Sequence, residues 1–148
     1  MKRKPTLAPW VRLVREPNLT PLSGDLIRSP EDVFRLLAPR LQAEEVEVFV
    51  ILALDTRSRV RSVSEVSRGL LNSSLVHPRE VFRIALAMGA MGIILAHNHP
   101  SGDATPSADD QAVTRQLVAA GELLDIPVFD HVVIAGSTFT SFATRGLL

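Results

Sequence analysis

The stretch ILAHNHPSGDATPSADD, residues 94–110, joins the pattern of a buried strand to side chains that bind metals. Its apolar start ends in two histidines one residue apart, His97 and His99, and a Pro-Ser-Gly-Asp break follows. Ser-Ala-Asp-Asp at positions 107–110 then has the character of a helix start. The chain has four histidines, and two of them lie here, with Asp110 eleven positions after the second. Ordinary packing does not explain that concentration.

The spacing of these residues suits a zinc site. Side chains two apart at the end of a strand lie on one face, so His97 and His99 can bind one zinc ion at about 2.0–2.1 Å each. The loop over residues 100–106 folds the chain back, and the helix that opens at Ser107 brings Asp110 toward the histidines. Two histidines and one aspartate leave the fourth zinc position for water, which is typical of a catalytic site.

A purely structural interpretation exists beside the metal site. Ser-x-x-Asp is also a capping box, in which Ser107 caps the helix and Asp110 reaches back to its amide. Local backbone could satisfy His97 and His99. The cap accounts for Ser107 and Asp110 but leaves the paired histidines without a purpose, so the metal site is favoured.

Composition limits the alternatives. The 148 residues predict one domain, and the absence of cysteine excludes disulfides, thiolate metal sites and a cysteine nucleophile. A metal must therefore use imidazole and carboxylate ligands. No apolar run approaches the roughly 20 residues that cross a bilayer, and the start lacks the core of a signal peptide, so we expect a cytoplasmic protein.

Residues 1–28 predict an extended basic arm, and residues 29–148 predict the folded domain. Within the first 22 residues Glu16 is the one acid, against five cations: Lys2, Arg3, Lys4, Arg12 and Arg15. Such an arm could contact nucleic acid or an acidic partner. A solvated tail that keeps the protein soluble explains the same charges and is favoured.

The rest of the chain alternates loosely between strand and helix patterns. Ser29 and Pro30 start a helix that Pro39 is expected to end. Further helices are predicted from Pro78 and over residues 107–124, and strands over residues 46–55, 60–69, 91–97, 126–136 and 138–142. This order predicts an α/β (α+β) fold with helices packed on a mixed sheet.

The run His97-Asn98-His99, seven residues, then Ser-Ala-Asp-Asp at 107–110, resembles the His-x-His-(x)7-Ser-x-x-Asp signature of the JAMM (MPN+) zinc metalloproteases. The segments LVHPREVF, ILAHNHPSGD, LLDIPVFDHVVI and RGLL look like the RadC branch of that superfamily, over roughly residues 25–148. The resemblance implies a JAMM/MPN-like (cytidine-deaminase-like) sheet flanked by helices. Longer RadC members carry a helix-hairpin-helix module before this domain, and the short, proline-broken arm predicts a form without it.

The resemblance also implies roles: Zn²⁺ bound by His97, His99 and Asp110, an oxyanion or carbonyl contact from Ser107, and a glutamate base from an earlier strand. The candidate bases are Glu44, Glu45, Glu47 and Glu65. Glu47 interrupts the apolar run VEVFVIL, where an acid is costly to bury unless something uses it, and the family's base lies near the start of this strand. Glu47 is the expected base rather than an exposed strand-end acid, and Glu45 is the next candidate.

Other polar residues receive structural interpretations. Asp103 is expected in a turn, Asp109 in the first turn of a helix, and His131 as a satisfied core or edge histidine rather than part of the site. Arg57, Arg59 and Arg61 follow at period two, which predicts one basic strand face that could receive phosphates or an acidic tail. A solvated hairpin edge that blocks strand-to-strand aggregation explains these arginines at least as well.

The sequence therefore predicts a zinc-dependent metalloprotease or isopeptidase-like hydrolase with a peptide or protein substrate. The alternative is a RadC-like DNA-repair or nucleic-acid-associated factor with a structural or vestigial zinc site, which the basic arm and the arginine face support. A third hypothesis is a scaffold that forms a homodimer through its sheet or a helix face.

Overall fold

A five-stranded mixed sheet forms the centre of the protein, with its strands in the order β2-β1-β3-β4-β5. The computed structural model describes residues 24–69 and 76–148. Neighbouring strands run antiparallel except β3 and β4, which are parallel. The elements in chain order are α1 (Pro30–Leu41), β1 (Val48–Leu54), β2 (Val60–Arg68), α2 (Pro78–Ala87), β3 (Gly92–Asn98), α3 (Ala108–Leu124), β4 (Val128–Ala135) and β5 (Thr138–Ser141).

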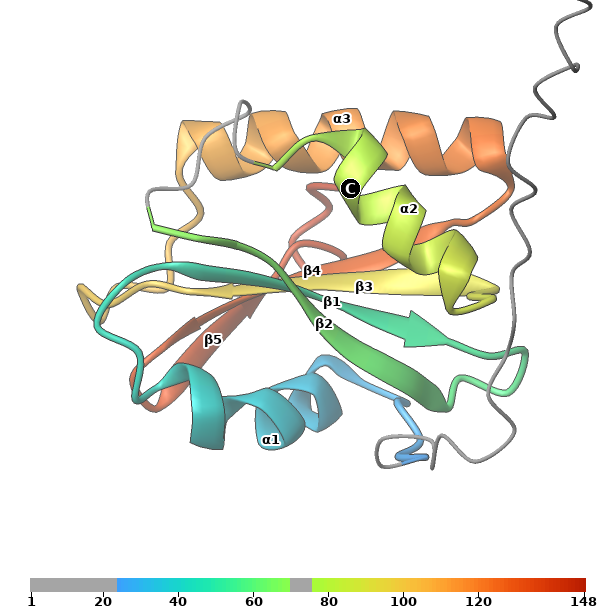
Figure 1. The fold of residues 1–148 in the computed structure, drawn as a ribbon. Coiled ribbons are helices and arrows are strands. Elements are labelled where there is room, and N and C mark those ends of the chain that lie inside the picture. Colours follow the sequence, from blue (N-terminus) through green and yellow to red (C-terminus); the bar gives the residue numbers. More distant parts are fainter. Residues whose placement is uncertain (1–23, 70–75) are drawn as a thin grey trace, which may run out of the picture.

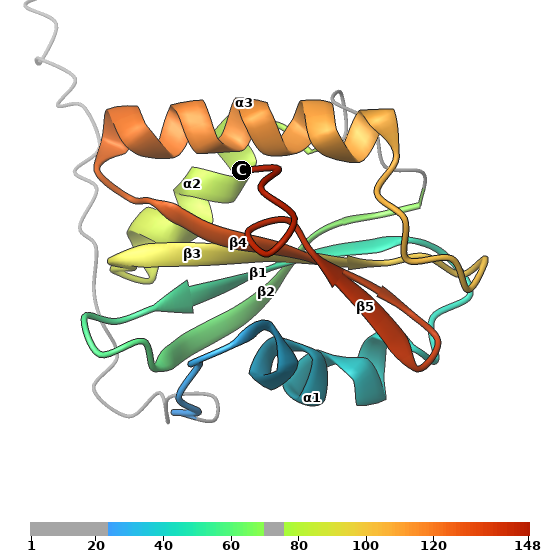
Figure 2. The same cartoon turned by 180° about the vertical axis from the view of Figure 1, so that it is seen from behind.

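Helices cover both faces of the sheet: α1 lies on one face, and α2 and α3 lie on the other (Figures 1 and 2). Alternate residues of β1 serve the two faces, so Val50 and Leu52 pack with α1 while Phe49 and Ile51 pack with α2 and α3. All seven residues of β1 are buried as a result. This explains the continuous apolar run in the sequence and confirms the predicted α/β class.

The position of β3 decides where the histidines lie. This strand sits between β1 and β4, and all of its seven residues are buried. His97 is aligned with Phe49 of β1 and Val133 of β4. The pleat turns His97 toward the face covered by α2 and α3, as it does Ile93 and Leu95.

Helix α1 corrects one detail of the sequence analysis. Its start is as predicted, since the Asp32 carboxylate accepts from the backbone N–H of Arg28 and of Ser29 at 2.9 and 3.2 Å. Its predicted end at Pro39 is wrong, because the helix continues to Leu41. Pro39 lies on the exposed side, while Leu41 is buried against the sheet. Burial of a leucine contributes about 1.5–3 kcal/mol, which is comparable with the cost of about 3 kcal/mol for an interior proline.

The predicted basic strand face of Arg57, Arg59 and Arg61 is wrong. Arg57 lies in the turn between β1 and β2, and Arg61 alone of the three is within β2. The Asp55 carboxylate accepts from the backbone N–H of Arg57 and of Arg59 at 2.8 and 2.9 Å, which fixes this turn. Aspartate side chains favour such local bonds to the backbone over strand pairing.

The predicted arm lies largely outside the described residues, which begin at residue 24. Its last part pairs with the β1–β2 turn and with the first residue of β2: the Ile27 N–H donates to the Ser58 carbonyl at 3.0 Å, and the Val60 N–H donates to the Asp25 carbonyl at 2.9 Å. Among the described helices, none has the length and apolar character needed to cross a membrane.

Candidate metal centre

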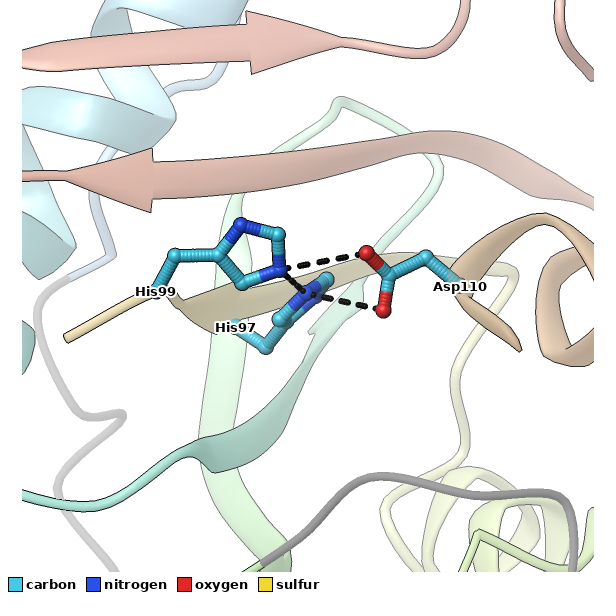
Figure 3. Close-up of side chains that lie close together, drawn as sticks. All are labelled: His97, His99 and Asp110. Carbon is cyan, nitrogen blue, oxygen red and sulfur yellow. Dashed lines mark hydrogen bonds and ion pairs between the residues drawn. The ribbon is translucent and has the colours of Figure 1, made fainter. Parts of the chain in front are cut away.

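His97, His99 and Asp110 point their side chains at one another (Figure 3). The Nε2 atoms of the two histidines lie 3.0 Å apart. The Asp110 oxygens lie 3.2 Å from the His97 Nε2 and 3.1 Å from the His99 Nε2. A tetrahedral zinc ion with ligands at 2.0–2.1 Å spaces its ligand atoms about 3.3 Å apart. The three side chains therefore have the donor types and nearly the spacing that such an ion requires.

Strand β3 and the loop after it position the two histidines. His97 is fully buried at the end of the strand, and His99 is slightly exposed beyond it. The His99 N–H still donates to the Ile134 carbonyl of β4 at 2.8 Å, so its backbone is held to the sheet. Gly102 then takes a φ of +87°, a left-handed conformation that favours glycine, and its N–H donates to the His99 carbonyl at 3.1 Å. This tight loop returns the chain to the start of α3.

The capping box at the start of α3 orients the Asp110 carboxylate. The Asp110 N–H donates to the Ser107 Oγ at 3.0 Å, and the Ser107 N–H donates to the Asp110 Oδ2 at 2.8 Å. The carboxylate is almost wholly buried, and both of its oxygens face the histidines. The cap predicted from Ser-x-x-Asp is therefore present, and the same Asp110 carboxylate also faces the two histidines.

The electrostatics of the cluster favour an ionised Asp110. Burial opposes ionisation, but the contacts with His97 and His99, together with the hydrogen bond from the Ser107 backbone, outweigh it and hold the pKa of Asp110 well below its usual range. The hydrogen bond to Asp110 raises the pKa of His99, and the negative charge of Glu47 adds to that effect. A negative charge thus lies beside two imidazole nitrogens, which is an environment that attracts a cation.

The tautomer of neutral His99 is fixed by the hydrogen bond that its Nδ1 makes. His99 Nδ1 lies 2.7 Å from the Asp103 backbone carbonyl, which can only accept a hydrogen bond, so Nδ1 carries the proton. In the neutral ring the Nε2 lone pair then faces His97 and Asp110. Metal-binding histidines commonly hold their other N–H in this way.

The four candidate glutamates differ in their ion pairs, in their exposure and in their effect on His99. Glu44 and Glu65 form ion pairs with Arg68 at 2.6 and 2.9 Å, and Glu45 is exposed. Glu47 is half-buried at the entrance to β1, and it is the candidate whose charge bears on His99.

The Asn98 side chain holds the backbone on both sides of Glu47. The Val48 N–H donates to Asn98 Oδ1 at 2.7 Å, and Asn98 Nδ2 donates to the Val46 carbonyl at 2.9 Å. The residue between the two histidines therefore ties β1 to β3 at the point where Glu47 lies, a role that the sequence analysis did not identify.

His131 and Thr114 lie directly behind His97, in contacts that the sequence did not predict. His131 is buried as expected, but its Nε2 lies 2.8 Å from the His97 Nδ1. Burial holds the pKa of His131 well below its ordinary value, so the ring is neutral. One signal was present in the sequence: Thr114 follows Asp110 by one helical turn and shares its face.

The expected turn and helix residues take simple places. The Asp103 carboxylate accepts from the Thr105 N–H at 2.9 Å, within the loop, and Asp109 is exposed in the first turn of α3. Neither side chain joins the cluster, although the Asp103 carbonyl contacts His99.

A mixed sheet between helices, with His-x-His at the end of a central strand and an aspartate from the next helix, defines a JAB-type domain. Residues 27–147 match the RadC-like JAB domain, and the chain belongs to that family. The family predicted from the histidine motif is confirmed.

Relatives at high identity carry the name UPF0758 protein. One from Thioalkalivibrio sulfidiphilus is 54% identical over 84% of this chain and 56% of its own length. One from Moorella thermoacetica is 50% identical over 86% of this chain and 56% of its own, and one from Symbiobacterium thermophilum is 44% identical over 97% and 61%. The chain thus spans about three-fifths or less of the length of these relatives.

Proposed function

We propose that the chain is a zinc-dependent hydrolase of the JAMM type, which cleaves a peptide or isopeptide bond in a peptide or protein substrate. The observation that carries the proposal is the triangle of His97 Nε2, His99 Nε2 and the Asp110 carboxylate, with 3.0–3.2 Å between its atoms. These are ligands of zinc, and three protein ligands leave one coordination position open, as in catalytic zinc sites. Membership of the JAB family supports the same assignment.

When bound, zinc would supply a Lewis acid that polarises the substrate carbonyl and lowers the pKa of a water molecule to roughly 7. Glu47 is the proposed general base. It would accept the proton of the attacking water and pass it to the leaving amine. Its place beside His99 and the Asn98 clamp on its neighbouring backbone support that role.

Ser107 is the proposed donor to the developing oxyanion. In the cap its hydroxyl oxygen accepts from the Asp110 N–H, which uses a lone pair and leaves the hydroxyl proton for another partner. Ser107 is exposed beside the buried carboxylate, so that proton can reach a substrate. One preorganised donor of this kind contributes about 2.7–4 kcal/mol in other hydrolases.

Zinc content and hydrolysis of a quenched fluorescent peptide library, extended with lysine-branched isopeptides, test the proposal together. We expect one zinc per chain and cleavage of at least one library class. Glu47→Gln should retain zinc and lose cleavage, whereas the matched control Glu45→Gln should retain both. Absence of zinc from metal-replete protein, or full activity in Glu47→Gln, would contradict the assignment.

The nucleic-acid alternative is tested separately by affinity for a DNA duplex across salt concentration. A basic arm that contacts phosphates gives affinity that falls steeply as salt rises. The five cations of that arm lie outside the described residues, and the arginine face that supported the alternative does not exist. The hydrolase is therefore the better-supported function.

A further inference from the structure

Three hydrogen bonds link His97 to Asp110 through residues behind the candidate metal centre. His97 Nδ1 lies 2.8 Å from His131 Nε2, and His131 Nδ1 lies 2.6 Å from Thr114 Oγ1. Thr114 Oγ1 in turn lies 2.6 Å from the backbone carbonyl of Asp110. The chain of contacts starts and ends on two of the three proposed ligands.

The donor and acceptor of each of these three hydrogen bonds follow from the bond between Thr114 and the Asp110 carbonyl. A carbonyl oxygen can only accept, so the Thr114 hydroxyl gives its single proton to Asp110. Thr114 must then accept from His131, which places the His131 proton on Nδ1. The Nε2 of the neutral His131 ring is therefore an acceptor, and His97 Nδ1 carries the proton between the two rings. The remaining lone pair of His97, on Nε2, faces His99 and Asp110.

Among the described residues, the surroundings of His131 offer its ring nitrogens no hydrogen-bond partners other than Thr114 and His97. The ring is fully buried, stacked on Phe142 at a centroid distance of 4.6 Å and met edge-on by Phe49 at 5.5 Å. Aromatic rings supply neither of its nitrogens with a conventional partner. Thr114 and His97 therefore satisfy both nitrogens of His131, and a buried nitrogen without a partner is costly.

We propose that Thr114 and His131 are positioning residues that set the tautomer of His97 and so keep its Nε2 free for the metal. The inference rests on the proposed zinc site for its purpose, but the tautomer belongs to the protein without metal. The same bonds join α3 to β3 and β4, and they hold Asp110 and His97 at the spacing of a shared ion. Neither residue needs to touch substrate.

Removal of the Thr114 hydroxyl should reverse the direction of the hydrogen bond between His131 and His97. In Thr114→Val the side chain keeps its shape, but His131 Nδ1 loses its acceptor. The His131 proton then moves to Nε2, where it donates to His97 Nδ1. The His97 proton moves to Nε2, which is the nitrogen the metal needs. Loss of such a supporting partner typically lowers metal affinity about 10–100-fold.

The test combines proton–nitrogen correlation spectra of ¹⁵N-histidine in metal-free protein with zinc affinity from chelator competition. Wild type and Thr114→Ser should show His97 and His131 protonated on Nδ1 and should bind zinc equally. Thr114→Val should show His97 protonated on Nε2 and about 10–100-fold weaker zinc binding. Thr140→Val is the matched control, because Thr140 is also buried but lies on β5, two strands from His97.

The possible failures are distinct. Wild-type His97 protonated on Nε2, or Thr114→Val with unchanged tautomer and affinity, would overturn the inference while leaving the zinc site intact. A wild type that takes up no zinc but holds His97 protonated on Nδ1 would refute the proposed function and support the tautomer assignment. If Thr114→Val does not fold, His131→Phe serves instead, and its His97 signals should then show a mixture of tautomers rather than one.

Discussion

Replacement of Asp110 by asparagine should destabilise the metal-free protein in a way that depends on pH. The carboxylate accepts from the Ser107 N–H at 2.8 Å and lies 3.1 Å from the His99 Nε2. The asparagine side chain would keep an oxygen for the cap but would lack the charge that pairs with His99. Because the carboxylate is almost wholly buried, the pair is little screened by water. One hydrogen bond to a charged group contributes about 1.5–3 kcal/mol.

The pH window follows from the two shifts. The pKa of Asp110 lies below its unfolded value of about 3.9, so its contribution is present above that pH and is lost as pH falls through the folded pKa. The pKa of His99 is raised mainly by Asp110, so its contribution is complete below the unfolded value of about 6.5 and is lost as pH rises through the folded pKa. Both pKa shifts arise from the same interaction, the pairing of the Asp110 carboxylate with protonated His99. This pairing is strongest between about pH 4 and 6.5.

Urea unfolding of chelator-treated wild type and Asp110→Asn, from pH 4.5 to 9, measures this effect. We expect a difference in the free energy of unfolding of about 1.5–3 kcal/mol near pH 5.5 that shrinks once His99 loses its proton. The control Asp109→Asn, at the exposed neighbouring position, should show a small difference with no such decline. A difference between wild type and Asp110→Asn that is independent of pH, or that grows with pH, would refute the pairing.

Three further results are expected. Asp110→Ala and His97→Ala should lose zinc, by elemental analysis, yet stay folded by circular dichroism, because the apolar packing of α1 on one face of the sheet and of α2 and α3 on the other does not depend on the metal. Loss of the fold would contradict this. Ser107→Ala should lower stability by about 0.5–2 kcal/mol and slow turnover. Ser107→Asp should restore the melting temperature but not turnover, since a carboxylate cannot donate to an oxyanion, and recovery of both would leave Ser107 as a cap alone. Zinc affinity should fall as pH drops below the raised pKa of His99, because a proton on Nε2 competes with the metal, and pH-independent affinity would argue against His99 as a ligand.

Much of the site was accessible from local sequence because its main residues are set by short-range periodicity. The two-residue spacing of His97 and His99 on a strand places both on one face. Ser107 and Asp110 form a capping box, which is a feature of four consecutive residues. The apolar runs of β1 and β3 likewise predicted strands covered on both faces.

The residues that were missed depend on contacts between distant parts of the chain. His131 meets His97 because β4 lies parallel beside β3, and neither strand order nor register can be read across a separation of 34 residues. Asn98 reaches Val46 and Val48 across the β1–β3 pairing for the same reason. The predicted end of α1 at Pro39 was wrong for a related reason. The local preference against proline inside a helix was outweighed by the burial of Leu41 against the sheet.

The central claim is that His97, His99 and Asp110 bind one zinc ion. Anomalous diffraction at the zinc absorption edge, from crystals of zinc-loaded protein, tests it most directly. The account predicts one strong peak at about 2.0–2.1 Å from the Nε2 atoms of both histidines and from an Asp110 oxygen. A peak located elsewhere, or no peak between these three side chains in fully loaded protein, would contradict it.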